Sequence, residues 1–171
     1  MNALNNLCNG ISNLFDRACD KGQSHLDLYV SNLPRDTFSQ CAHNFMFSSS
    51  AGFIIAGWRP FVLSTSSQRR NALISGVLAV VATAVHALCM KGFKQLHNFY
   101  ADRRSNRAIS PISWEERHVA FIVGWGGTLC LADALGLAIN AKASFFMTIS
   151  LRILDIYQRY PHTPVMGTIV V

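Results

Sequence analysis

Two ionisable side chains lie inside long apolar stretches of this sequence, and they are the first candidates for chemistry. His86 lies within the uncharged run 71–90, and Asp133 interrupts the apolar run 118–141. Ionisable groups in such surroundings are costly to bury and are functional candidates by default. A His–Asp proton relay would need both groups at one depth. If both runs cross a membrane as helices, however, the two residues differ in depth by about 12 Å, so we expect no relay.

A positively charged partner for Asp133 is present elsewhere in the sequence. Arg69 and Arg70 precede the run that contains His86 and would lie near the same membrane surface as Asp133. A carboxylate that faces an arginine can stay charged at such a place. We therefore expect a structural ion pair between Asp133 and Arg69 or Arg70. Transport of an ion or solute past Asp133 is the alternative.

Motifs of familiar catalytic or cofactor chemistry do not occur in the sequence. It contains no phosphate-binding glycine loop, no HExxH and no GxSxG. Cys41-Ala-His43 and His86-Ala-Leu-Cys89 each offer two metal ligands, fewer than a site requires. Gly124-Trp-Gly-Gly127 lies in an apolar run, where close helix packing is the expected use. We expect no catalytic residues, no cofactor and no metal, and hence no enzyme.

The composition is that of a membrane protein. Half of the residues are hydrophobic and 14% are charged, against about 25% charged in soluble domains. The charges collect between three long apolar stretches. In a soluble protein they would be spread along every surface helix, because each such helix needs a hydrated face. The net charge of +6 comes from cations beside these stretches, where membrane orientation and lipid headgroups explain them. The expected partner is the lipid bilayer, and a nucleic acid is not expected.

Three transmembrane helices are predicted, at about residues 37–58, 71–90 and 118–141. Helices of this length cover a bilayer core of about 30 Å at 1.5 Å per residue. The first is polar in its first two turns. The third follows Ser113-Trp-Glu-Glu116, which matches a capping box. The fold class is therefore an all-α membrane protein, with a transmembrane bundle over 37–141.

An amphipathic segment, 1–36, precedes this bundle. Apolar residues recur at spacings of three and four over residues 2–20, opposite a face made mostly of asparagine. Gly22 is suited to end the helix. The alternation over 26–30 predicts a short extended piece after it.

A second amphipathic helix and a short tail are predicted for residues 142–171. A fourth span would bury Arg152 and Asp155, at about 2.5–3.5 kcal/mol each near the bilayer centre. Between a fourth span over 143–158 and a helix at the interface, we expect the interfacial helix. Its polar face would contain Ser144, Thr148, Arg152, Asp155 and Arg159.

The distribution of Lys and Arg predicts the orientation. The N-terminal segment and the basic loop 91–117 lie on one side and contain nine of these residues, whereas six lie on the other side. Cytoplasmic loops are enriched in Lys and Arg. We expect the N-terminus and the 91–117 loop to be cytoplasmic.

Small residues follow one face of each of the last two spans. Lipid gives helices no hydrophobic reason to associate, so such faces are where helices pack. They predict a compact bundle, self-association or contact with other membrane proteins. The faces consist of Ser75, Ala79, Thr83 and Ala87 in one span, and of Gly126, Cys130, Asp133 and Gly136 or Leu137 in the other.

The first two spans form a bilobed hydrophobic hairpin over residues 37–90. Its hydropathy resembles that of the small inclusion-membrane proteins that obligate intracellular bacteria insert into the host vacuole. The resemblance implies a vacuole-membrane protein and transfers no functional residue. We expect a non-enzymatic multi-pass membrane protein that acts as a scaffold, a complex subunit or a vacuole-membrane interaction protein. The alternative is a small transporter or channel-like oligomer that uses Asp133.

Overall fold

The computed structural model describes residues 2–30, 33, 36–56, 66–103 and 112–159. Within these residues every regular element is a helix, which confirms the all-α prediction for this part of the chain. The elements are α1 (Asn2–Tyr29), α2 (Thr37–Ala56), α3 (Ser66–Arg103), α4 (Trp114–Phe121), the π-helix η1 (Ile122–Gly126), α5 (Gly127–Ala134) and α6 (Ile139–Arg159).

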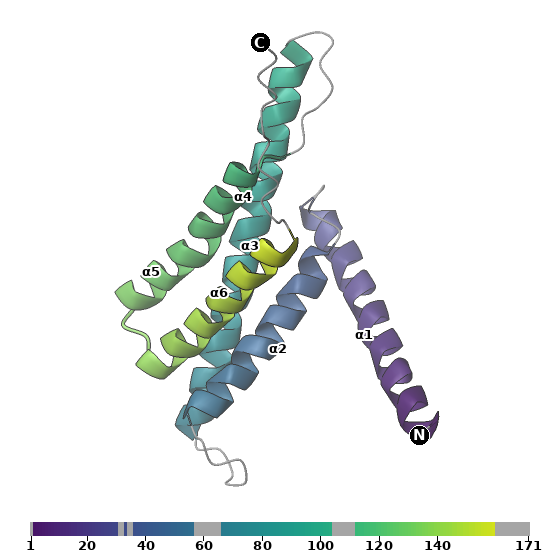
Figure 1. Cartoon of the computed structure of the whole chain (residues 1–171), viewed down its shortest axis with the longest axis vertical. Coiled ribbons are helices and arrows are strands. Elements are labelled where there is room, and N and C mark those ends of the chain that lie inside the picture. Colours follow the sequence, from purple (N-terminus) through teal and green to yellow (C-terminus); the bar gives the residue numbers. More distant parts are fainter. Residues whose placement is uncertain (1, 31–32, 34–35, 57–65, 104–111, 160–171) are drawn as a thin grey trace, which may run out of the picture.

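Four helical rods form a bundle, in which α4, η1 and α5 run on as one rod beside α2, α3 and α6 (Figure 1). The most extensive interface joins α2 and α3, and α6 packs against both of them. α1 contacts the beginning of α2 and diverges from the bundle (Figure 1). The apolar core lies between α3, the α4–α5 rod and α6, and consists of Leu78, Ala79, Ala82, Phe121, Trp125, Ala132, Phe145 and Ile149.

α1 is longer than the sequence pattern predicts. Gly22 does not end it, and the extended piece predicted at 26–30 is wrong, because the helix continues to Tyr29. A Cβ at Gly22 would collide with the ring of Phe38, so this glycine permits close approach between α1 and α2. Next to it, the Gln23 side chain accepts a hydrogen bond from the Phe38 N–H (3.0 Å). These contacts with α2 hold the last turns of α1 helical.

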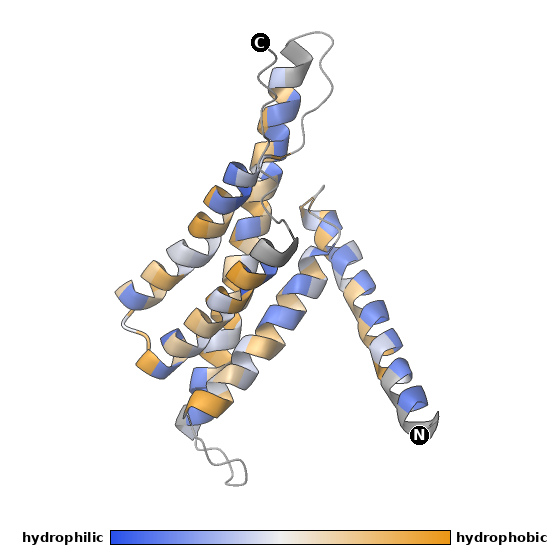
Figure 2. Ribbon diagram, viewed as in Figure 1, coloured by the Kyte–Doolittle hydropathy of each residue, from blue (hydrophilic) through white to orange (hydrophobic). Residues whose placement is uncertain are grey.

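The first two predicted spans correspond to α2 and α3. α2 matches the span 37–58 except for its last two residues, which lie outside the described residues. α3 exceeds the span 71–90 at both ends, so the first half of the predicted loop 91–117 is helical. Figure 2 shows α2 hydrophilic over its first half and more hydrophobic toward its end. Among the described helices, α3 is the one whose segment Gln68–Tyr100 is long and apolar enough by itself to cross a membrane.

The capping box predicted before the third span is confirmed. The Ser113 hydroxyl accepts a hydrogen bond from the Glu116 N–H (3.2 Å), and the Glu116 carboxylate accepts one from the Ser113 N–H (2.8 Å). This reciprocal pair satisfies two amides that a helix start would otherwise leave unpaired. The rod therefore begins at Trp114, four residues before the predicted span 118–141.

The same rod ends earlier than predicted, at Ala134. Gly136 adopts a positive φ of 64°, which an L side chain rarely accepts. Its N–H bonds to the Asp133 carbonyl (2.9 Å), and the Leu137 N–H bonds to the Ala132 carbonyl (3.1 Å). This is the Schellman arrangement that closes a helix. The chain reverses here, so α6 returns beside α5 instead of continuing the third span to residue 141.

α6 lies in the bundle with its polar face inward, which corrects the expectation that this face meets water. Ser144 and Thr148 are buried, whereas Phe146 and Leu154 are exposed. The helix packs against α2, α3 and α5. On this face Arg152 donates to Asn44 of α2, whereas Ser144 and Thr148 donate to carbonyls of α6 itself.

Candidate functional site

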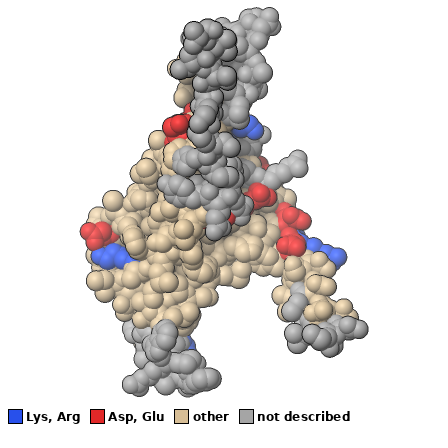
Figure 3. Space-filling model, viewed as in Figure 1, with Lys and Arg blue, Asp and Glu red and all other residues tan. Residues whose placement is uncertain are grey.

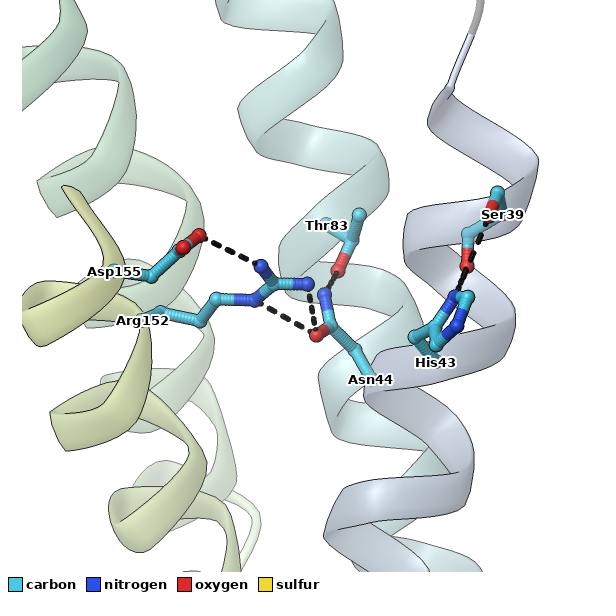
Figure 4. Close-up of polar contacts among 6 residues, drawn as sticks. All are labelled: Ser39, His43, Asn44, Thr83, Arg152 and Asp155. Carbon is cyan, nitrogen blue, oxygen red and sulfur yellow. Dashed lines mark hydrogen bonds and ion pairs between the residues drawn. The ribbon is translucent and has the colours of Figure 1, made fainter. Parts of the chain in front are cut away.

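A hydrogen-bonded network of four side chains joins three helices in the interior of the bundle (Figure 4). Arg152 of α6 donates from Nε to Asn44 Oδ1 of α2 (2.8 Å) and from Nη2 to the same oxygen. Asn44 Nδ2 donates to Thr83 Oγ1 of α3 (2.8 Å). The Arg152 Nη1 group also pairs with Asp155 Oδ2, one turn further along α6 (3.2 Å). We refer to these four residues as the Asn44 network.

The Thr83 hydroxyl accepts a hydrogen bond in this network because its own proton is used within α3. The Thr83 hydroxyl donates to the Ala79 carbonyl one turn earlier (2.7 Å), which leaves its oxygen to accept from Asn44. Asn44 is 4% exposed and Thr83 is 2% exposed. A buried polar group without a partner costs about 1–3 kcal/mol. The network avoids that cost and ties α6 to the α2–α3 pair.

A second polar contact joins α2 and α3, one turn after Asn44 on α2 and about two turns before Thr83 on α3. Ser48 Oγ donates to the Ser75 carbonyl (3.0 Å), and Ser75 Oγ donates to the Ser48 carbonyl (3.2 Å). Ser75 and Thr83 belong to the small-residue face predicted for the second span, and all four residues of that face are buried. Nearby, a Cβ on Gly52 would lie 2.7 Å from Ala72 Cα. This face of α3 is thus used for packing within the chain.

A cavity of about 580 Å³ lies beside the Asn44 network and is partly open to the surface. Its wall includes residues of α2, α3, the α4–α5 rod and α6. Gln40 at its edge is exposed, whereas Phe121 and Trp125 in its wall are buried. The cavity therefore runs from a polar opening to an aromatic wall inside the bundle.

His86, one of the two candidates from the sequence, lines this cavity. Its imidazole meets the ring of Phe121 edge-on, with 6.2 Å between centroids. Among the described residues, the ring nitrogens of His86 have no hydrogen-bond partner. Gly124 packs directly on this part of α3, because a Cβ there would lie 2.8 Å from the Ala82 carbonyl oxygen. The close packing predicted for the glycine-rich segment is confirmed at Gly124.

Asp133, the other candidate, lies at the opposite end of the bundle and is exposed. Its Oδ1 pairs with Lys142 Nζ (2.6 Å), and its side chain is 75% exposed. The expected pairing with Arg69 or Arg70 is therefore corrected. The Schellman turn folds the first turn of α6 back along the end of α5, and this places Lys142 against Asp133. His86 and Asp133 are not brought together.

The paired metal-ligand motifs do not converge in the described parts of the chain. No group of three or more His, Cys, Asp or Glu side chains gathers there. His43 Nδ1 bonds to the Ser39 carbonyl one turn earlier (2.8 Å). The Cys41 thiol is directed at the Val80 carbonyl (4.0 Å).

The Asn44 network was not predicted as a site. Its signals were present in the sequence, as a polar beginning of the first span and as the Arg152–Asp155 pair counted against a fourth span. Polar side chains in two apolar helices can hydrogen-bond to each other only when the two helices are neighbours. The sequence does not show which helices are neighbours.

Comparisons with protein-family models, with curated proteins and with solved structures give no match. The function of the chain is therefore inferred from its own residues and their arrangement.

Proposed function

We propose that this chain is a non-enzymatic, multi-pass membrane protein in which α2, α3, the α4–α5 rod and α6 each cross the bilayer. The observation that carries this proposal is an inverted distribution of polarity. Small polar residues fill contacts between the helices instead of facing outward. The buried polar residues within these four rods are Thr37, Asn44, Ser48, Ser75, Thr83, Thr128, Ser144 and Thr148.

Large apolar side chains cover the outside of the same rods. Figure 3 shows a broad middle zone of one face without Lys, Arg, Asp or Glu. Contiguous apolar surfaces of this kind are rare on soluble monomers and suit contact with lipid. Exposed examples from each rod are Phe47 and Phe53, Leu73 and Val77, Ile122 and Leu131, and Phe146 and Leu154.

The helix lengths support four crossings. α2 has 20 residues and α6 has 21. At 1.5 Å per residue these helices extend about 30 Å, the thickness of a bilayer core. The rod Trp114–Ala134 has a similar length. α3 is longer, with 38 residues, and extends beyond the bundle at the end that carries Arg103.

The free-energy cost of burying the charged Arg152 side chain does not oppose a fourth crossing in this structure. Arg152 lies seven residues before the end of α6 at Arg159, which is about 10 Å from that end and not at the bilayer centre. It also has partners in Asn44 and Asp155. Ionisable groups in membranes characteristically face the bundle interior and pair there.

Four crossings strengthen the orientation argument. The N-terminal segment, the connection between α3 and α4, and the end of α6 then share one side. Ten Lys and Arg residues belong to that side when the adjoining ends of α3 and α4 are included, against Arg59, Arg69, Arg70 and Lys142 on the other, with Arg152 inside the bundle. Positive residues accumulate on the cytoplasmic side. We therefore place both ends of the described chain in the cytoplasm.

We further propose that the protein serves as a scaffold or complex subunit, as the resemblance to vacuole-membrane proteins also suggests. Two elements outside the bundle expose apolar side chains that a partner could cover. α1 exposes Ile11 and Leu14, and the projecting end of α3 exposes Leu96 and Tyr100. The interior polar groups, in contrast, bond to one another across helices, as Asn44 and Ser48 do, or to carbonyls of their own helix, as Thr128 does, which favours a structural use.

Accessibility of introduced cysteines tests the number of crossings. In a variant without native cysteines, single cysteines at Lys21, Ser66 and Ala138 are labelled with a membrane-impermeant maleimide in sealed vesicles, and a C-terminal tag is probed with protease. Four crossings place Lys21 and the tag on one side, and Ser66 and Ala138 on the other. A tag on the same side as Ala138 would reduce the count to three.

One alternative, a small transporter or channel-like oligomer, is favoured by the cavity alone. The packed apolar core fills the interior beyond the cavity, and Asp133 lies outside it. Affinity purification in mild detergent, followed by mass spectrometry, separates the two functions. Stable foreign subunits support the scaffold, whereas a pure homo-oligomer supports the alternative.

A further inference from the structure

The cavity beside the Asn44 network has the size and the lining of a ligand site. Its volume of about 580 Å³ falls within the range of about 300–1,000 Å³ typical of small-molecule sites. Cationic and imidazole donors come from three separate rods. Arg117 of α4, His86 of α3 and Arg152 of α6 line it together.

Arg152 retains donor capacity toward the cavity. A guanidinium has five N–H groups, and the described contacts to Asn44 and Asp155 engage three of them. His86 adds a ring nitrogen that has no hydrogen-bond partner among the described residues. Arginine recognises phosphate and carboxylate groups through paired N–H donors. These donors match an oxyanion.

The acidic groups at the cavity do not reverse this preference. Asp155 is already paired with Arg152, and Asp36 lies exposed at the edge. Two arginines and two aspartates line the cavity, so net charge does not decide between cations and anions. The N–H donors of Arg152 that its described contacts leave unused favour an anion.

We propose that this cavity binds an oxyanion, a phosphate or a carboxylate, through Arg117, Arg152 and His86. Phe121 and Trp125 supply an apolar wall beside these donors. This combination favours an anion attached to an apolar body, and an anionic lipid headgroup is the source best suited to it. The choice of a lipid rests on the proposed membrane location, because the bilayer supplies the ligand.

Trp125 provides the reporter for a binding test. In a Trp58→Phe, Trp114→Phe background it is the remaining tryptophan, and its fluorescence is followed on the full chain in a non-ionic detergent. The titrants are dioctanoyl phosphatidate, dioctanoyl phosphatidylcholine and inorganic phosphate. We expect saturable binding of phosphatidate and much weaker binding of phosphatidylcholine, which has the same chains without the net charge.

Variants then identify the site. Arg117→Gln and His86→Gln should each raise the dissociation constant about tenfold or more, since a hydrogen bond to a charged group contributes about 1.5–3 kcal/mol. Arg70→Gln removes one charge at the opposite end of the bundle and should leave binding unchanged. Circular dichroism of each variant confirms that it is folded. Equal weakening by Arg70→Gln and Arg117→Gln would overturn the proposal.

The same titrations distinguish the sources of the anion. Tighter binding of phosphatidate than of inorganic phosphate supports the lipid headgroup, and equal binding supports a soluble anion at the same site. Binding of neither overturns the site itself. That result leaves the membrane topology intact, because the cysteine-labelling assay measures it independently.

Discussion

Replacement of Asn44 by alanine should be among the most damaging single changes in the bundle interior. It removes the amide that donates to Thr83 and the oxygen that accepts from Arg152. A bond between neutral groups contributes about 0.5–1.5 kcal/mol and one to a charged group about 1.5–3 kcal/mol. Within membranes, measured interhelical bonds average about 0.6 kcal/mol. We expect Asn44→Ala to lower the free energy of unfolding by about 1–4 kcal/mol.

Unfolding in SDS–detergent mixtures, followed by tryptophan fluorescence, measures this loss. Trp125 is 2% exposed and stacks on Phe145, with 5.6 Å between ring centroids, so its emission reports the loss of core packing. Asn140→Ala is the matched control. Asn140 lies exposed in the first turn of α6. Surface substitutions of this kind usually change stability by less than about 0.5 kcal/mol.

A double-mutant cycle with Thr83→Val tests the physical reason for the loss. Both variants break the same hydrogen bond, so their combined effect should be smaller than the sum of the single effects by at least about 0.5 kcal/mol. Additive effects, or an Asn44→Ala variant as stable as Asn140→Ala, would refute the view that this network ties the three helices together.

Three further predictions concern other parts of the fold. Gly124→Ala should lower the free energy of unfolding by about 1–3 kcal/mol, because its Cβ would press on α3, whereas Gly127→Ala, with nothing within 4 Å of its Cβ, should be neutral in the same SDS assay. The Glu116 carboxylate accepts from the Ser113 N–H (2.8 Å) and pairs with His97 Nε2 (2.6 Å). Glutamine lacks the negative charge that strengthens both contacts, so the melting temperature of Glu116→Gln should lie below that of the parent at about pH 7. The difference should shrink at about pH 3, where carboxyl groups are mostly protonated. Asp133→Leu, whose ion pair is exposed, should destabilise the fold less than the Asn44 variant; a larger loss in the unfolding assay would contradict this.

Local chemistry along the chain determined several features that the structure retains. Ser113 and Glu116 are the right residues at the right spacing for a capping box, so the start of the third rod followed from the sequence. Long uncharged runs required helices, because each backbone N–H must find a partner within an apolar segment. The small residues Ser75 and Thr83 likewise marked the face of α3 that packs against α2.

Tertiary structure decided which groups meet. Asp133 received Lys142 as its partner because one positive-φ glycine, Gly136, reverses the chain after α5. The same reversal brings α6 back into the bundle, where Asn44 accepts hydrogen bonds from Arg152 and Asp155 supplies the opposite charge. A sequence shows that a helix has a polar face, but whether water or another helix satisfies that face depends on contacts between residues more than one hundred positions apart, as for Asn44 and Arg152.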